Sequence, residues 1–536
     1  MITRRLLALA LAFACSVAGT RGSGAADERI LHVGLVQQPN SLDPLHAVQF
    51  YENYLAEAIF SALTVIDDRG NVSPDLALRV PTRANGDISA DGKTIVYHLR
   101  PGVRWQDGVP LTARDVAFTF GLMRDPKTNF PEASVYSIVD RVDTPNDLTV
   151  VLHLRSAWAD ATSELFVGGQ DGSIVPEHAL RGVTDLTTAR FESMPIGSGP
   201  YAVERWDRGS RIALRANPSY FRGAPKIGRI DIDFVPDQNT LAIRIRTGEL
   251  DFSPQVPQTA AAQIPPTPRL RRVSAPTFND LELGFKTDEK PFDDGRIRHA
   301  LALAIDRTRL AAYVLHGYAV TADDLVPPQS PAHRTDPRAL ATGDPAVAAR
   351  LLAAAGWIAG SDGLRRKNGV VLSVPLTVPA GYAMVNAAAL QIQAMWRAIG
   401  VDTNLRAIPS NVMYAPAIGA LPSGRFVAFL ATDGYATSPD RADTLTSRGL
   451  PPNGRNYMRY VDRDVDAWTA QARTTLDDAK RYDVYHRISE RVRAAAPLTP
   501  LIWQKQVYAY AASLNGVRPE TVNSDFWNVY AWRFAP

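Results

Sequence analysis

The chain has 536 residues, of which 46% are hydrophobic and 21% charged, so it is long enough for several globular domains and carries no sign of a long disordered tract. Its 58 basic and 55 acidic residues nearly balance, and without residues 1–26, which contain three arginines and no acidic residue, the two counts are equal. This balance gives no support for a nucleic-acid-binding protein. The single cysteine, Cys15, excludes a disulfide within the chain.

The first 26 residues have the layout of an export signal. Two arginines precede an apolar core, Leu6–Gly19, and small residues at 23–26 provide a cleavage site. A membrane anchor is the alternative, but a helix that spans a bilayer needs about 20 apolar residues, more than this core provides. We therefore predict a cleaved signal peptide at 1–26 and a soluble, exported mature protein. Lipid attachment at Cys15 is a further alternative, which the poor lipobox in front of it disfavours.

A strand, a loop and a helix open the mature chain. Apolar and other residues alternate over Leu31–Leu35, a turn-rich loop covers Gln37–Pro44, and a helical pattern follows at Tyr51–Leu63. Further on, alternation over Thr94–Leu99 predicts another strand. The TARDV segment at 112–116 has the spacing of a capping box, which predicts a helix start there.

The middle of the chain predicts a strand followed by a helix. Apolar and charged residues alternate over Arg229–Phe234, as in a half-buried strand. Asp237 can cap a helix over Gln238–Thr247, and Gly248 can end it. Such a unit is typical of α/β architecture.

Later segments repeat this alternation of strands and helices. We predict an extended run at Asn279–Phe285, an amphipathic helix at Ile297–Ala304, and a helix followed by a strand within 388–408. The continuous apolar run Phe426–Ala431 predicts a strand covered on both faces. Short apolar segments within Leu498–Ala511 again predict strands.

Several short motifs, in a fixed order, resemble the signature of family 5 extracellular solute-binding proteins, the peptide-binding receptors of bacterial ABC importers. The motifs are Gly199-Pro200-Tyr201, Asn217-Pro218-Ser219-Tyr220-Phe221, Pro236-Asp237 and Gly248-Glu249-Leu250-Asp251. The segments Leu99–Val116 and Arg298–Asp306 also match the family's pattern closely. The resemblance extends over nearly all of the mature chain.

The resemblance implies an α/β fold of the periplasmic binding protein type, with two mixed-sheet lobes joined by a hinge and a family-specific extra lobe. The implied ligand-facing lobe combines residues 27–62, 195–285 and 498–536. The extra lobe is 63–194, and the opposing lobe is 286–497. The hinge would lie where the chain crosses between lobes, near 285 and 498.

No constellation of catalytic residues is visible in the sequence. No histidine is followed by glutamate, so the zinc-protease helix is missing, and the mature chain has no thiol. Gly92-Lys93-Thr94 resembles the end of a phosphate-binding loop, but Asp87 stands where the loop needs its first glycine. We therefore expect neither enzymatic activity nor a cofactor. A secreted hydrolase, whose catalytic residues meet only in space, is the alternative from another class.

The resemblance implies that the loop after the Phe426–Ala431 strand carries an aspartate that pairs with the ligand's α-amino group. Counting back four positions from Pro439, where the family has this acidic residue, gives Tyr435. Asp433 lies two residues earlier and has the role if the loop is longer, while Asp440 is a weaker candidate. The alternative is that Asp433 only caps the turn that it forms with Gly434.

A ligand captured between the two implied lobes would lie in a cleft. Four other residues are candidates for lining this cleft: Gln37, Gln38, Asn279 and Trp503. We predict a monomeric periplasmic receptor that captures a small solute and delivers it to inner-membrane ABC permease subunits. A short peptide is the solute that the resemblance favours. A receptor of the same family for an opine, a metal chelate or heme is the alternative.

Overall fold

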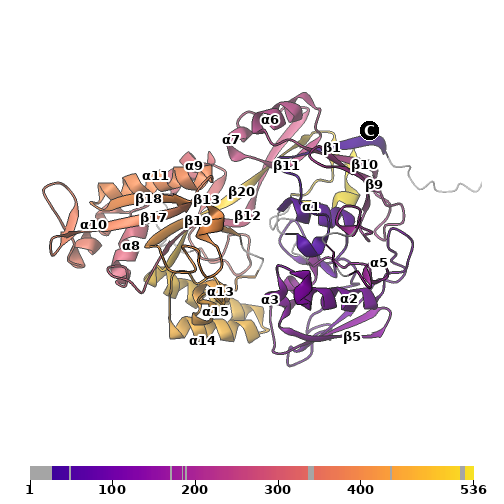
Figure 1. Cartoon of the computed structure of the whole chain (residues 1–536), viewed down its shortest axis with the longest axis horizontal. Coiled ribbons are helices and arrows are strands. Elements are labelled where there is room, and N and C mark those ends of the chain that lie inside the picture. Colours follow the sequence, from indigo (N-terminus) through magenta and orange to yellow (C-terminus); the bar gives the residue numbers. More distant parts are fainter. Residues whose placement is uncertain are drawn as a thin grey trace, which may run out of the picture.

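The computed structural model of the chain describes residues 27–47, 50–168, 172–183, 185–186, 190–335, 343–434, 438–519 and 525–535. Figure 1 shows two bodies that are joined in the middle by two long strands, β12 (Leu270–Phe285) and β20 (Leu498–Ala511). Of the helices that the structure describes, none combines the length and hydropathy that a membrane span needs. The signal peptide predicted for 1–26, including Cys15, lies outside the described residues.

Within the described residues, one sheet of 11 strands runs through both bodies. Its order is β18, β17, β19, β12, β20, β11, β1, β10, β9 and β8, and β13 pairs with β20. Beyond β12 and β20, the strands are β1 (Asp27–Leu35), β8 (Tyr201–Asp207), β9 (Arg211–Ala216), β10 (Ile227–Phe234), β11 (Phe252–Val256), β13 (Ala319–Thr321), β17 (Ser373–Pro379), β18 (Asp402–Ile408) and β19 (Ala428–Gly434). The two predicted lobes are therefore halves of one continuous sheet.

The antiparallel pairing of β12 with β20 is interrupted in the middle of both strands. The register shifts between Pro276 and Asp280, so that residues 277–279 have no regular partner in β20. The Thr277 hydroxyl donates to the carbonyl of Gln504, 3.0 Å away, which holds the gap together. We call residues 277–279 and Gln504 the register gap. The hydrogen-bond ladder between the two halves of the sheet is interrupted at this place.

The ligand-facing lobe has a mixed sheet in which β1 lies between two parallel neighbours. β1 pairs in parallel with β10 and β11, and Leu31, Val33 and Leu35 are buried, as their alternation predicts. Helix α6 (Gln238–Thr247) begins where the Asp237 carboxylate accepts a hydrogen bond from a backbone N–H of its first turn. These two predicted elements are confirmed. The short helix α7 (Gln258–Ala261) follows β11.

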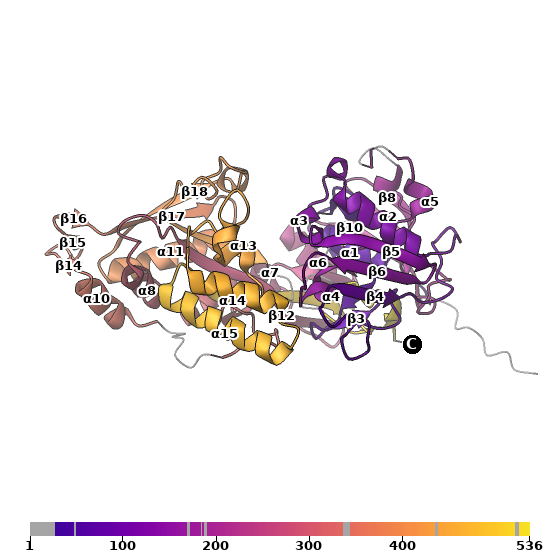
Figure 2. The same cartoon turned by 90° about the horizontal axis from the view of Figure 1, so that it is seen from below.

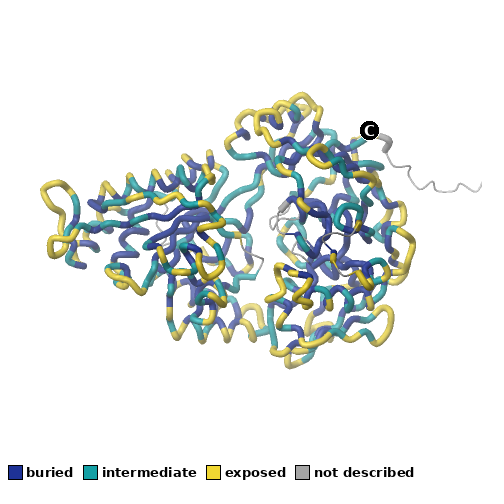
Figure 3. Tube along the Cα trace, in the orientation of Figure 1, coloured by how far each residue is buried: buried dark blue, intermediate teal, exposed yellow. Residues whose placement is uncertain are grey.

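The extra lobe packs on the core of the ligand-facing lobe. One continuous cluster of buried residues joins Leu31 of β1 and Phe252 of β11 to Trp105 and Leu152 of the extra lobe, and Figure 3 shows this buried interior. The elements of residues 44–194 are η1 (Pro44–His46), α1 (Phe50–Ile59), β2 (Thr64–Ile66), β3 (Val72–Pro74), β4 (Thr94–His98), α2 (Ala113–Arg124), η2 (Pro126–Thr128), α3 (Ala133–Tyr136), β5 (Val139–Asn146), β6 (Thr149–Leu154), α4 (Ala161–Glu164), β7 (Val167–Gly168), α5 (Glu177–Leu180) and η3 (Arg190–Glu192). The predicted capping box is present, since the backbone N–H of Thr112 donates to Asp115 at 2.8 Å.

The opposing lobe has a separate core on each face of its sheet. Leu430 of β19 packs with helices on one face, and its neighbour Phe429 packs with α14 and α15 on the other (Figure 2). The remaining elements are α8 (Gly295–Leu303), α9 (Arg307–Leu315), α10 (Pro345–Ala354), β14 (Ile358–Ala359), β15 (Arg365–Lys367), β16 (Val370–Val371), α11 (Ala383–Ala398), α12 (Ser410–Met413), α13 (Ala442–Leu445), η4 (Ser447–Gly449), α14 (Arg463–Thr474), α15 (Asp478–Ala495), β21 (Leu514–Asn515), η5 (Val529–Ala531) and β22 (Arg533–Phe534). The last three belong to the carboxyl-terminal segment, which returns to the ligand-facing lobe.

The sequence analysis placed the chain crossings near 285 and 498. These positions are the ends of β12 and β20 inside the opposing lobe, whereas the register gap lies nearer the middle of both strands. The difference arises because the pairing of two strands far apart in sequence cannot be read from either strand alone. The lobe boundaries themselves stay a prediction.

Gly284 of β12 leaves room for the ring of Phe429 on the neighbouring strand, since a methyl group there would overlap this ring. We predict that Gly284→Ala lowers the free energy of unfolding by about 1–3 kcal/mol, because a packed core resists an added methyl. Gly121, on the exposed side of α2, has no atom near its added methyl. As the control, Gly121→Ala should raise stability by roughly 0.5–1 kcal/mol. Thermal melts of both variants test this, and equal effects would contradict it.

Candidate ligand-binding site

Three parallel strands of the opposing lobe end beside the register gap. β17 pairs in parallel with β18 and β19, so their carboxyl ends lie at one edge of the sheet. β12 runs antiparallel to β19, and its Asn279 pairs with Gly434 at the end of that strand. In open α/β sheets, ligands bind in the crevice outside the carboxyl ends of the strands. This edge is therefore the expected position of a ligand-binding site.

A cavity of about 230 Å³ lies at this edge. Its described lining is aromatic and polar, and all of it comes from β12 or from the opposing lobe. The lining residues are Glu282, Pro379, Tyr382, Ser410, Tyr414, Leu421, Phe429, Ala431, Thr432, Asp433, Thr444, Arg455, Tyr457 and Met458. We call this space the edge cavity.

Asp433, in the wall of the edge cavity, is held by an arginine. Nη1 of Arg455 donates to both carboxylate oxygens of Asp433, at 2.8 and 2.9 Å, and Nε of Arg455 donates to Asp443 at 2.8 Å. The backbone N–H of Gly434 also donates to Asp433, at 2.9 Å. One guanidinium is thus divided between two carboxylates, and this fixes the position of Asp433.

One carboxylate of β12, Glu282, lines the edge cavity. Because side chains alternate along strands, Asp280 and Glu282 share the sheet face of their β19 partners Asp433 and Ala431. Burial, together with the charges of Glu282 and Asp433, raises the pKa of Tyr414. Burial and the carboxylate of Glu282 also raise the pKa of Asp280 well above its ordinary value, against the lowering effect of Arg441.

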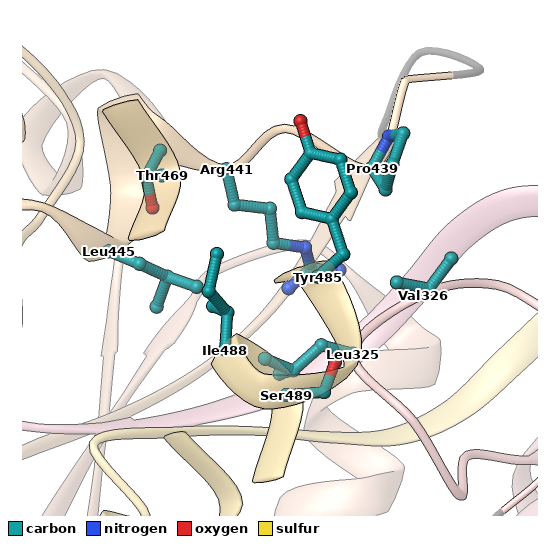
Figure 4. Close-up of a pocket in the computed structure, with 9 residues that line it drawn as sticks. All are labelled: Leu325, Val326, Pro439, Arg441, Leu445, Thr469, Tyr485, Ile488 and Ser489. Atoms are coloured by element: carbon teal, nitrogen blue, oxygen red, sulfur yellow. The ribbon is translucent and has the colours of Figure 1, made fainter. Parts of the chain in front are cut away.

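Arg441 and Trp503 lie behind this wall and support the hinge strands. The Arg441 guanidinium is 3.7 Å from Asp280 and 6.0 Å from the centre of the Trp503 ring, and all three side chains are buried. Figure 4 shows Arg441 among the residues that line a second cavity, next to Tyr485. That cavity measures about 10 Å³, which is at the limit of what a single water molecule needs. It is a packing void.

The structure brings three of the predicted site residues together. Asn279 and Asp433 lie on paired strands, with the Asn279 side chain over Gly434, and Trp503 pairs with Asp280 from the other side. Trp503 is fully buried, which gives it a packing position.

The other predicted residues are elsewhere. Gln37 and Gln38 follow β1 in the ligand-facing lobe, where the Gln38 side-chain oxygen accepts a hydrogen bond from the N–H of Gly209 at 2.7 Å. Asp440 is bonded to Arg473 rather than directed at the edge cavity. Tyr435 lies outside the described residues. The ligand-binding role of the six predicted residues stays a prediction.

Glu282, Arg455 and the three tyrosines of the edge cavity were not predicted from the sequence. A signal for Glu282 was present, since Asp280 and Glu282 alternate with two leucines, which places two carboxylates on one face of a strand. Arg455 gave no such signal, because it lies 22 residues from Asp433 in an irregular loop.

The two bodies also touch on the side away from the hinge. Asp160 of the extra lobe accepts a hydrogen bond from the Ser438 hydroxyl at 2.8 Å and is 3.4 Å from the guanidinium of Arg481. The neighbouring backbone N–H of Ala159 donates to the carbonyl of Arg473 at 2.8 Å. We call these contacts the interlobe contact. They connect the extra lobe to α14 and α15.

Comparison with known proteins identifies the family. The family described as bacterial extracellular solute-binding proteins, family 5 Middle, matches residues 71–455. The chain belongs to family 5 of the bacterial extracellular solute-binding proteins. The resemblance found in the sequence is thereby confirmed, and the protein is a family 5 solute-binding protein.

Curated relatives cover nearly the whole chain. Protein XP55 of Streptomyces lividans is 29% identical, over 92% of this chain and 87% of its own length. The oligopeptide-binding protein AppA of Bacillus subtilis is 25% identical, over 94% and 91%. The glutathione-binding protein GsiB of Salmonella paratyphi A is 26% identical, over 97% of both chains.

Solved structures share the fold. Bacillus subtilis AppA in complex with a nonapeptide matches with a TM-score of 0.75 and 24% identity, over 95% of this chain and 99% of AppA. Campylobacter jejuni NikZ in complex with Ni(L-His) matches with a TM-score of 0.75 and 23% identity, over 94% and 99%. The α/β fold of the periplasmic binding protein type, predicted from the sequence, is confirmed. Among the described residues, no group of three or more His, Cys, Asp or Glu is arranged to hold a metal ion.

A buried carboxyl group lies next to the hinge on the ligand-facing side. Asp525 accepts a hydrogen bond from the Gln506 amide at 2.9 Å, and that amide also donates to the Tyr54 hydroxyl at 3.1 Å. Burial raises the pKa of Asp525 to about 7, although hydrogen bonds from Tyr508, Tyr54 and Gln506 act in the opposite direction. The folded protein therefore holds a proton here that the unfolded chain releases near pH 4.

This proton predicts that stability falls as pH rises from about 4 to about 7 and then levels off. Asp525→Asn should remove that part of the pH dependence and make the protein more stable than wild type at pH 8. The free energy of unfolding of the variant at pH 8 should exceed that of wild type by at most roughly 4 kcal/mol. Thermal melting between pH 4.5 and 8 measures it. Parallel profiles for the variant and wild type would contradict the prediction.

Proposed function

We propose that this protein is a periplasmic receptor that captures a short peptide between its two lobes and delivers it to the inner-membrane permease of an ABC importer. The observation that carries the proposal is the edge cavity, which lies at the carboxyl ends of three parallel strands and next to the two strands that join the lobes. Family membership and the peptide-binding relatives AppA and GsiB support it. We further propose that the protein acts as a monomer and has no enzymatic activity.

A receptor for a non-peptide solute is the second candidate, and the nickel chelate named for NikZ favours it. An opine or heme belongs to the same class. Gentle purification followed by mass spectrometry of the released ligand distinguishes these candidates. A peptide supports the main proposal, and a chelate or an opine overturns it in favour of the second.

The interlobe contact predicts an equilibrium between closed and open forms that Asp160 biases. Asp160→Asn keeps an acceptor for Ser438 but removes the ion pair with Arg481, so the ligand-free protein should open and its radius of gyration should increase. Ligand affinity should fall a few-fold, because closure then costs more free energy. Small-angle scattering measures the first effect. Asp140→Asn, on the exposed side of β5, is the control and should change neither value. An unchanged radius in Asp160→Asn would contradict the prediction.

Asp433 is our proposed partner for the ligand's α-ammonium group. Its carboxylate accepts three hydrogen bonds from Arg455 and Gly434, and since a carboxylate has about four lone-pair sites, it retains capacity for one more donor. Asp433→Asn should lower peptide affinity by roughly 30-fold or more, which corresponds to about 2 kcal/mol. Calorimetric titration with the identified peptide and with its N-acetylated form measures this.

Two comparisons make the Asp433 result specific. The N-acetylated peptide should bind wild type weakly and lose little more in the variant, because it has no ammonium group. Asp140→Asn removes an exposed carboxylate of β5 outside the edge cavity and should leave affinity nearly unchanged. Wild-type affinity in Asp433→Asn would rule out the ammonium role.

A further inference from the structure

A buried carboxyl group without a cationic partner lies beside the interlobe contact. Glu164 belongs to the short helix α4 of the extra lobe, which begins after Asp160. Its Oε1 atom is shielded from solvent and, among the described residues, has neither a hydrogen bond nor an ion pair. The backbone N–H of Ser438, on the opposing lobe, donates to the carboxyl group of Glu164, while the hydroxyl of the same serine donates to Asp160. Both carboxyl groups therefore face the opposing lobe.

The two arginines at this contact are paired with other carboxylates. Arg481 of α15 is 3.4 Å from Asp160 and 2.9 Å from Asp478. Arg473 of α14 donates through its Nε to Asp440. Figure 1 shows both helices on the side of the opposing lobe that faces the extra lobe. Closure of the lobes thus places a third buried carboxyl group where the two arginines already have partners.

This environment disfavours the charged form of Glu164. Burial raises the pKa of Glu164 well above its ordinary value, and the charges of Asp160 and Asp440 raise it further. Glu132 of the extra lobe makes a smaller contribution of the same sign, and the N–H of Ser438 acts in the opposite direction. When the lobes separate, Ser438 and Asp440 move away and water reaches the carboxyl group, so its pKa returns toward the ordinary value. Closure therefore binds a proton.

The two aspartates of the contact differ from Glu164 in this respect. Burial raises the pKa of Asp160 and of Asp440 as well. Arg481 opposes this effect at Asp160, and Arg473 opposes it at Asp440, so each aspartate keeps a cation next to its charged form. Glu164 is the carboxyl group of this cluster that gains most from being neutral.

We propose that Glu164 is a proton-dependent latch: the lobes close when its carboxyl group is neutral, and ionisation of that group favours the open form. The proton is taken from solvent on closure and returned to solvent on opening. The inference rests on the lobe motion in the proposed function and is independent of which solute is bound. Because closure binds a proton, lower pH favours the closed form, and the ratio of closed to open protein changes by up to about tenfold for each pH unit.

Small-angle scattering of the ligand-free protein at pH 5.5 and pH 8 tests the latch. Both values lie above the ordinary glutamate pKa of 4.5, so an exposed Glu164 is ionised at both. The buried phenols of Tyr482 and Tyr485 have raised pKa values and stay neutral in this range. Wild type should have a larger radius of gyration at pH 8 than at pH 5.5, because the open form is then more populated.

Variants assign this pH dependence to one carboxyl group. Glu164→Gln is neutral at every pH and should keep, at pH 8, the radius that wild type has at pH 5.5. Glu164→Met, which is also neutral, should behave in the same way and provides a second test of the charge. Glu204→Gln removes an exposed carboxylate on β8, far from the contact, and should retain the wild-type pH dependence.

The outcomes separate the latch from the motion on which it rests. A wild-type radius that does not change with pH, or a pH dependence that both Glu164 variants retain, overturns the latch. If Asp160→Asn opens the protein at pH 5.5 in that case, the lobe motion stands and the latch alone is wrong. A radius that stays the same in Asp160→Asn and at both pH values overturns the lobe motion and the latch together.

Discussion

The pairing of β12 with β20 is the constraint on which the rest of the structure depends. These two strands lie at the centre of one sheet that both lobes share. The strands of the opposing lobe continue from β12, and those of the ligand-facing lobe continue from β20. Continuous pairing would make the sheet a single stiff unit. The register gap at residues 277–279 removes several ladder bonds at one place and replaces them with side-chain bonds such as that from Thr277 to Gln504. A turn about this place disturbs few other contacts.

The position of the site follows from that constraint. β17 and β19 run parallel to each other and antiparallel to β12, so their carboxyl ends reach the register gap, and a ligand at this edge lies where the lobes turn. The buried pair of Asp280 and Arg441 stands directly behind this edge, with Trp503 against it. Burial raises the pKa of Asp280 well above its ordinary value, so desolvation outweighs the attraction to Arg441 and the contact contributes little net stability. Its value here is geometric, since it fixes the strands that carry Glu282 and Asp433.

Local signals in the sequence predicted the elements, and family motifs predicted their arrangement. Asp237 begins α6 and Thr112 begins α2 as their capping patterns indicate, because these interactions span only a few residues. The edge cavity could not be predicted in the same way. It joins Glu282 to Arg455 from distant segments, and only the strand register and the loop paths decide that they meet. Trp503, which was predicted to line the cleft, is fully buried between the strands, and its binding role stays a prediction.

The apolar core that the ligand-facing and extra lobes share determines how many rigid bodies the protein has. The ligand-facing and extra lobes bury one continuous apolar cluster, and separating them would expose that cluster to water at a cost of roughly 25 cal/mol for each Å² of apolar surface. They therefore act as one body, and the opposing lobe acts as the other. The interlobe contact at Asp160 then belongs to the same motion as the register gap, although it lies on the opposite side of the molecule. In the hinge motion proposed above, separation of the lobes about the register gap would also break the contact at Asp160, so the proposal couples the two places through rigid bodies and needs no chain of intervening side chains.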